Sequence, residues 1–96
     1  MSPEEKISNV IALLESEFPN HEVPYQYNFD RGLHDLRIDA PEKLAKHHLR
    51  LSEQYVEDRS ADEIIEHLKG IGVKDLLQKS ATGNIFINTS GLFYED

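Results

Sequence analysis

The 96-residue sequence predicts an α+β fold in which a small antiparallel sheet carries helices on one face. Apolar residues recur at helical spacing at the start and in the middle of the chain, while residues 22–38 alternate between apolar and polar. The expected order is helix, strand, strand, helix, helix, short helix, then one or two strands. Because no internal repeat or linker is visible, residues 1–96 are expected to form a single domain.

The first helix is expected to begin at Ser2, a preferred capping residue, with Pro3 at its first helical position. Glu5 follows Ser2 at the spacing of a capping box. An apolar stripe continues the helical pattern until Pro19 and Asn20 end it. The stripe consists of Ile7, Val10, Ile11, Leu14 and Phe18.

The next segment has the period of two that is typical of half-buried strands. Pro24 cannot donate a ladder hydrogen bond, so its strand is expected at a sheet edge. Residues 30–32, Asp-Arg-Gly, supply turn chemistry between this strand and a second one. The two strands predict an antiparallel hairpin with one apolar face. That face consists of Val23, Tyr25, Tyr27, Phe29, His34, Leu36 and Ile38.

A second helix is expected to follow Asp39 and to run to about Asp58, because Asp39 and Glu42 have the spacing of a capping box and Pro41 lies in the first turn. Helical spacing places His48 on its buried stripe and His47 on the solvent side. The whole stripe is Leu44, Ala45, His48, Leu49, Leu51, Tyr55 and Val56.

Ser60 and Glu63 form a further capping box, which predicts a third helix. Gly70 is the expected C-terminal stop of this helix, and a short helix follows over residues 73–79. Its apolar side is formed by Ile64, Ile65 and Leu68.

The C-terminal segment is apolar on both faces of its expected strands, residues 85–87 and 92–94. Such a segment is either covered on both faces or open on one face to a partner. A homodimer through residues 85–94 is therefore one hypothesis.

Composition restricts the environment of the protein. The chain has no cysteine, which excludes disulfides and thiolate metal sites and fits a reducing compartment. The acidic N-terminus lacks the pattern of a signal peptide, and the longest apolar run, residues 10–14, is too short to cross a membrane. We therefore expect a cytoplasmic protein without membrane association.

Acidic residues are in excess, with 18 against 10 basic residues and a net charge of −8. They gather where the second and third helices are expected to meet, and only Arg59 opposes them. A cluster of this kind either attracts a basic partner or is a well-hydrated corner eased by salt. The candidate partner-binding residues are Glu53, Glu57, Asp58, Asp62, Glu63 and Glu66.

Residues 64–79 join two helical patterns through a Gly-Ile-Gly turn. This segment resembles a helix-hairpin-helix motif, which binds a nucleic-acid backbone without reading its sequence. The resemblance implies that the glycines let the main chain approach a phosphate. It implies contacts through Gly70, Gly72 and Lys74, with Lys69 and Lys79 adding charge. The same residues also fit a simple helix stop followed by a packing helix.

Two further resemblances concern element order. The helices and C-terminal strands of residues 64–94 are similar to a winged helix, which implies a recognition helix at residues 73–80. The order of the whole chain is similar to type II KH and BolA-like folds. The junction between the central helices, residues 57–62, lacks the glycines of the KH loop.

The sequence predicts neither a catalytic centre nor a cofactor or metal site. It contains no nucleophile elbow, no phosphate-cradling loop and no His-Glu-x-x-His motif. Glu63 and His67 could form only half of a metal site, so structural roles are expected for the histidines. A buried, neutral His48 would make stability sensitive to acid.

The leading expectation is a small, acidic, non-enzymatic intracellular module, such as an inhibitor, an immunity-like protein or an adaptor, that binds a basic protein. The alternative is nucleic-acid-backbone binding through residues 64–94.

Overall fold

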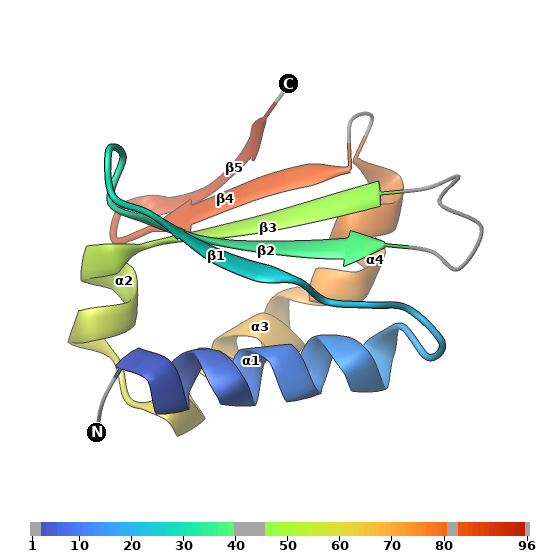
Figure 1. The fold of residues 1–96 in the computed structure, drawn as a ribbon, viewed down its shortest axis with the longest axis horizontal. Helices are drawn as coiled ribbons and strands as arrows, with labels where there is room; N and C mark the ends of the chain where they lie inside the picture. The colour runs from blue at the N-terminus through green and yellow to red at the C-terminus, as the bar shows by residue number, and fades with distance from the viewer. Residues whose placement is uncertain (1–2, 40–45, 81–82, 96) are drawn as a thin grey trace.

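The computed structural model describes residues 3–39, 46–80 and 83–95 and confirms the α+β fold class (Figure 1). The helices pack against one face of a five-stranded sheet. In chain order the elements are α1 (Pro3–Glu17), β1 (Tyr25–Asn28), β2 (Leu33–Asp39), β3 (Lys46–Ser52), α2 (Glu53–Asp58), α3 (Ala61–Ile71), α4 (Val73–Lys79), β4 (Asn84–Asn88) and β5 (Gly91–Glu95).

The sheet has the order β1-β2-β3-β4-β5 and is mixed rather than purely antiparallel. Strand β3 runs parallel to β4, whereas the other three neighbouring pairs are antiparallel. A parallel pair needs a long crossover, and helices α2, α3 and α4 supply it. The crossover is what places these helices against the sheet.

The prediction of a helix running to about residue 58 was wrong for residues 46–52, which form the central strand β3, whereas residues 53–58 are helical. Asp39 ends β2 instead of capping a helix, and Glu42 lies outside the described residues, as do Leu44 and Ala45. This extra strand also removes the similarity to the KH element order.

The strand reverses the two histidines. His47 faces the helices, where its ring lies 5.6 Å from that of Phe18, while His48 lies on the open face of the sheet beside Asp35. The prediction that His48 is the buried histidine was therefore wrong, because side chains alternate along a strand.

Other expected features are confirmed. Ser60 and Glu63 form the predicted capping box at the start of α3, and α4 has the predicted bounds. Strand β1 lies at a sheet edge, next to Pro24. Ser2, the expected cap of α1, lies outside the described residues.

The core lies between the helices and the inward face of the sheet. Leu14 of α1 and Leu68 of α3 are fully buried against the central strands. The completely buried strand residues are Leu36, Ile38, Leu49, Leu51, Ile85 and Ile87.

Candidate interaction surface

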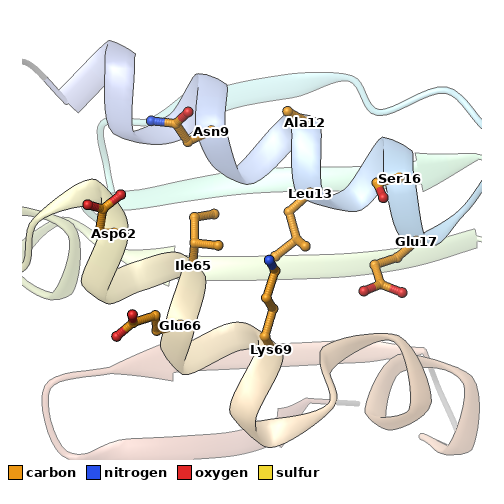
Figure 2. Close-up of a pocket in the computed structure, with 9 residues that line it drawn as sticks. All are labelled: Asn9, Ala12, Leu13, Ser16, Glu17, Asp62, Ile65, Glu66 and Lys69. Atoms are coloured by element: carbon orange, nitrogen blue, oxygen red, sulfur yellow. The ribbon is translucent and has the colours of Figure 1, made fainter.

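A groove with a volume of about 600 Å³ lies between α1 and α3 (Figure 2). It faces away from the sheet, and both of its walls are helix surfaces. The lining residues are Asn9, Ala12, Leu13, Ser16 and Glu17 of α1, and Asp62, Ile65, Glu66 and Lys69 of α3.

Helical spacing explains why these side chains share the groove. The α3 residues recur at i, i+3, i+4 and i+7, and the α1 residues follow the same rule. Residues Ala61, Ile64 and Leu68 of α3 turn toward the core instead. The small side chains of Ala12 and Ser16 leave room between the two helices.

The groove has an apolar floor and a charged rim. Leu13 and Ile65 provide the apolar surface. Figure 2 shows Asp62 and Glu66 at one end and Glu17 at the other, with the Lys69 ammonium between them. Three carboxylates against one ammonium leave the groove acidic.

The six carboxylates predicted as one partner site are not brought together. Asp62 and Glu66 line the groove, but Glu63 is occupied at the start of α3, where its carboxylate accepts from the Ser60 backbone N–H at 2.8 Å. That hydrogen bond lowers the pKa of Glu63. Glu63 therefore serves the helix terminus.

The three carboxylates of α2 lie elsewhere. The Gln54 amide donates to Asp58 at 2.7 Å. Glu53 accepts a hydrogen bond from the half-buried Tyr27 hydroxyl; desolvation and then this bond raise the pKa of Tyr27. Glu57 is exposed.

Lys6 stabilises the end of α2 in a way that the charge pattern did not reveal. Its ammonium donates to the carbonyl oxygens of Val56 at 2.9 Å and of Glu57 at 3.4 Å. Lys6 is only 9% exposed, and a cation at a helix C-terminus offsets the negative end of the helix dipole. A lysine within the apolar stripe of α1 was the available sequence signal.

The Gly70–Lys79 segment has the geometry of a helix end. Helix α3 passes through Gly70 and stops at Gly72, whose φ of 68° and ψ of 57° are left-handed. The Gly72 N–H already donates to the carbonyls of Leu68 and Lys69. Lys69 lines the acidic groove.

Two histidines, the buried His34 and the partly buried His67, pair with tyrosines. The Tyr25 hydroxyl lies 2.7 Å from Nδ1 of His34, and the Tyr55 hydroxyl lies 2.6 Å from Nδ1 of His67. Burial lowers the pKa of His34, and the Glu53 charge opposes that effect. Within residues 3–39, 46–80 and 83–95, no group of three potential ligands could hold a metal ion.

A second, smaller hollow of about 120 Å³ lies beside β1. Here the Asp35 carboxylate lies 3.4 Å from both Nδ1 of His48 and Nε of Arg50. A carboxylate can orient an imidazole for proton transfer, but none of the lining residues is a serine, threonine or cysteine that would be activated by it. They are Pro24, Tyr25, Gln26, Asp35, Arg37 and His48.

Sequence reasoning found the α3 half of the groove through Asp62 and Glu66 but missed the α1 half. Glu17 was overlooked because its carboxylate is distant in sequence from the acidic cluster. The signal that could have found it was the polar face of α1, where small residues stand one turn apart.

None of the described helices has the length and apolar character that crossing a bilayer requires. The chain matches no family model, no curated protein and no solved structure.

Proposed function

We propose that the protein is a non-enzymatic, cytoplasmic interaction module whose α1–α3 groove binds a basic, amphipathic segment of a partner protein. The observation that carries the proposal is an apolar floor with Asp62 and Glu66 at one end of the groove and Glu17 at the other. Inhibitors, immunity-like proteins and adaptors are classes that act by such binding.

The groove chemistry defines the ligand. An apolar side chain on the floor against Leu13 and Ile65 would supply affinity through burial. Exposed rim contacts contribute only about 0.2–1 kcal/mol each, so the carboxylates chiefly set orientation and specificity. Because Lys69 separates the acidic ends, the favoured segment carries two groups of basic residues with an uncharged stretch between them.

The net charge of −8 supports the same partner class at longer range. An acidic field accelerates the encounter with basic molecules, and salt screens this effect. We therefore expect association with a basic segment to slow as the salt concentration rises, while the apolar contribution persists.

Fluorescence anisotropy with designed peptides tests the proposal. One labelled peptide carries leucines at helical spacing flanked by lysines and arginines, a second replaces the basic residues with glutamates, and a third scrambles the first. We expect saturable binding of the basic amphipathic peptide at least about tenfold tighter than that of either other peptide, a difference of about 1.4 kcal/mol.

Matched variants separate the groove from the overall charge. Asp62→Lys combined with Glu66→Lys should weaken binding at least about tenfold. Glu15→Lys combined with Asp30→Lys makes the same change in net charge at exposed positions outside the groove and should preserve most of the affinity. Ile65→Gln tests the apolar floor.

Equal binding of the acidic and basic peptides would refute the proposal. Equal losses in the two double variants would show that overall charge, and not the groove, attracts the peptide. Once the groove variant is known to have lost peptide binding, wild type and this variant can be used side by side to capture proteins from a lysate. The natural partner is the protein that only wild type retains.

A further inference from the structure

The outer edge of β5 is unpaired (Figure 1). The three central residues of this strand are Leu92, Phe93 and Tyr94. Phe93 and Tyr94 are 48% and 60% exposed, although they belong to a strand. Among the described elements, none runs along the outer side of β5. An open edge with exposed aromatic residues is a ready template for another strand.

The composition of β5 leaves its outer edge open to pairing. Strand β5 contains neither proline nor lysine, and its single charged residue, Glu95, lies at its end. Proline, lysine and bulges usually block edge pairing, and β5 has neither of these two residues.

The sequence of β5 is suited to pairing with itself. In an antiparallel pair, directly opposed residues lie on the same face of the sheet. The register that pairs all five residues of β5 with five of an identical strand has Phe93 on the two-fold axis. Leu92 then stands opposite Tyr94 of the second copy, and Gly91 opposite Glu95.

This register satisfies both packing and charge. Glu95 opposes a glycine instead of a second carboxylate, which avoids the cost of like charges across strands. Phe93 already stacks with Phe86, their ring centroids 6.4 Å apart, and in this register the aromatic row continues into the second copy. Tyr94 covers the half-buried Leu92 of that copy on the opposite face.

We propose that β5 pairs antiparallel with β5 of a second copy about a two-fold axis at Phe93, which joins two five-stranded sheets into one continuous sheet. The helices of both copies lie on the same side of that sheet, so the edge contact leaves each α1–α3 groove accessible. The proposal is independent of the proposed function, because no groove residue belongs to β5.

Sedimentation equilibrium over a concentration series provides the first test. We expect reversible monomer–dimer exchange with a Kd at or below about 1 mM. Salt should strengthen the dimer, because each copy carries a net charge of −8 and screening reduces their repulsion. Salt would have the opposite effect on binding of a basic peptide in the groove.

Charge substitutions at the axis test the register. Phe93→Lys and Phe93→Glu each place like charges opposite one another and should raise the Kd at least about tenfold. An equimolar mixture of the two variants should recover dimers, since opposite charges then meet at the axis. Phe29→Lys is the matched control, because Phe29 is 85% exposed and lies beyond β1.

Cross-linking provides a second readout on near-native protein. The chain contains no cysteine, so Phe93→Cys introduces a single thiol, and opposed residues of paired strands have Cβ atoms about 4.5–5.5 Å apart. A short thiol-specific cross-linker should join Phe93→Cys copies and leave Phe29→Cys copies monomeric.

A wild-type protein that remains monomeric up to about 1 mM would overturn the proposal. So would a folded Phe93→Lys variant that dimerises like wild type, or a mixture of the two charged variants that stays monomeric. Circular dichroism of each variant establishes that it is folded before its assembly is compared.

Discussion

At the scale of single residues, the fold depends on a few polar side chains placed among apolar ones. Lys6 holds the end of α2, and His34 is buried next to Tyr25. The partner of Lys6 is distant in sequence, whereas that of His34 lies on the neighbouring strand of the same hairpin. Their contributions to stability can therefore be measured separately from those of the apolar core.

Lys6→Met should destabilise the protein by about 1–3 kcal/mol. Methionine keeps most of the apolar stem but leaves the Val56 carbonyl without its charged donor. Urea unfolding at pH 7 measures the loss. Lys79→Met is the control: it removes an exposed lysine from the last turn of α4 and should cost less than about 1 kcal/mol. Similar losses in both variants would contradict the assigned role of Lys6.

Stability should decrease as the pH falls below about 6.5, the usual pKa of histidine in an unfolded chain. Burial lowers the pKa of His34 and of His47 in the folded state. In this pH range the unfolded chain binds more protons than the folded one, so acid favours unfolding until the pH passes the lowered values. The midpoint of urea unfolding, measured at several pH values between 8 and 5, reports this loss of stability.

His34→Gln should reduce this pH dependence, because glutamine keeps a polar group near the Tyr25 hydroxyl but does not titrate. Adding His47→Gln should reduce it further. A double variant with the full wild-type slope would assign the acid sensitivity to other groups.

At the scale of elements, the sequence predicted seven or eight segments of regular structure and their approximate order, because their patterns are local. It failed at β3, where the apolar residues fit both a helical and a strand period. What makes residues 46–52 a strand is pairing with β2 on one side and with β4 on the other, for example Leu49 beside Ile85. No local pattern contains that information.

The groove was predicted only in part for the same reason. The acidic run marked Asp62 and Glu66, but their neighbour Glu17 comes from a helix far away in sequence. Charge density along the chain also overstated the site, since it counted Glu63, which caps its own helix.

Gly70 and Gly72 should respond to alanine with opposite signs. Gly72 has a positive φ of 68°, so Gly72→Ala should destabilise the protein by about 1–2 kcal/mol. Gly70 lies inside α3 with open space around an added Cβ, so Gly70→Ala should stabilise it by up to about 1 kcal/mol. Thermal unfolding of both variants measures this contrast, and equal effects would contradict the placement of the helix end at Gly72.

At the scale of the whole molecule, the topology separates the candidate surfaces. The crossover from β3 to β4 places α3 beside α1 and so forms the groove (Figure 1). The hairpin of β4 and β5 belongs to the sheet, and its outer strand, with exposed aromatic residues, lies away from α1 and α3. The proposed partner-binding groove and the proposed dimer edge therefore belong to different elements.

The overall charge bears on nucleic-acid binding, the alternative function that the Gly-Ile-Gly turn suggested. Binding to a phosphate backbone draws on several cationic side chains, which neutralise phosphates and release the counterions condensed on the nucleic acid. Here the net charge is −8, the Gly72 N–H is already bonded within α3, and Lys69 lies among carboxylates. We therefore expect no saturable binding of single- or double-stranded DNA or RNA, even at roughly 20 mM salt, where such contacts are strongest. Fluorescence anisotropy with labelled oligonucleotides checks this.

Binding that weakens steeply with salt and is abolished by Lys74→Glu combined with Lys79→Glu would contradict the expectation and restore the helix-hairpin-helix interpretation. If Glu15→Lys combined with Asp30→Lys bound nucleic acid where wild type did not, the negative field alone, and not the geometry of the turn, would be what prevents binding.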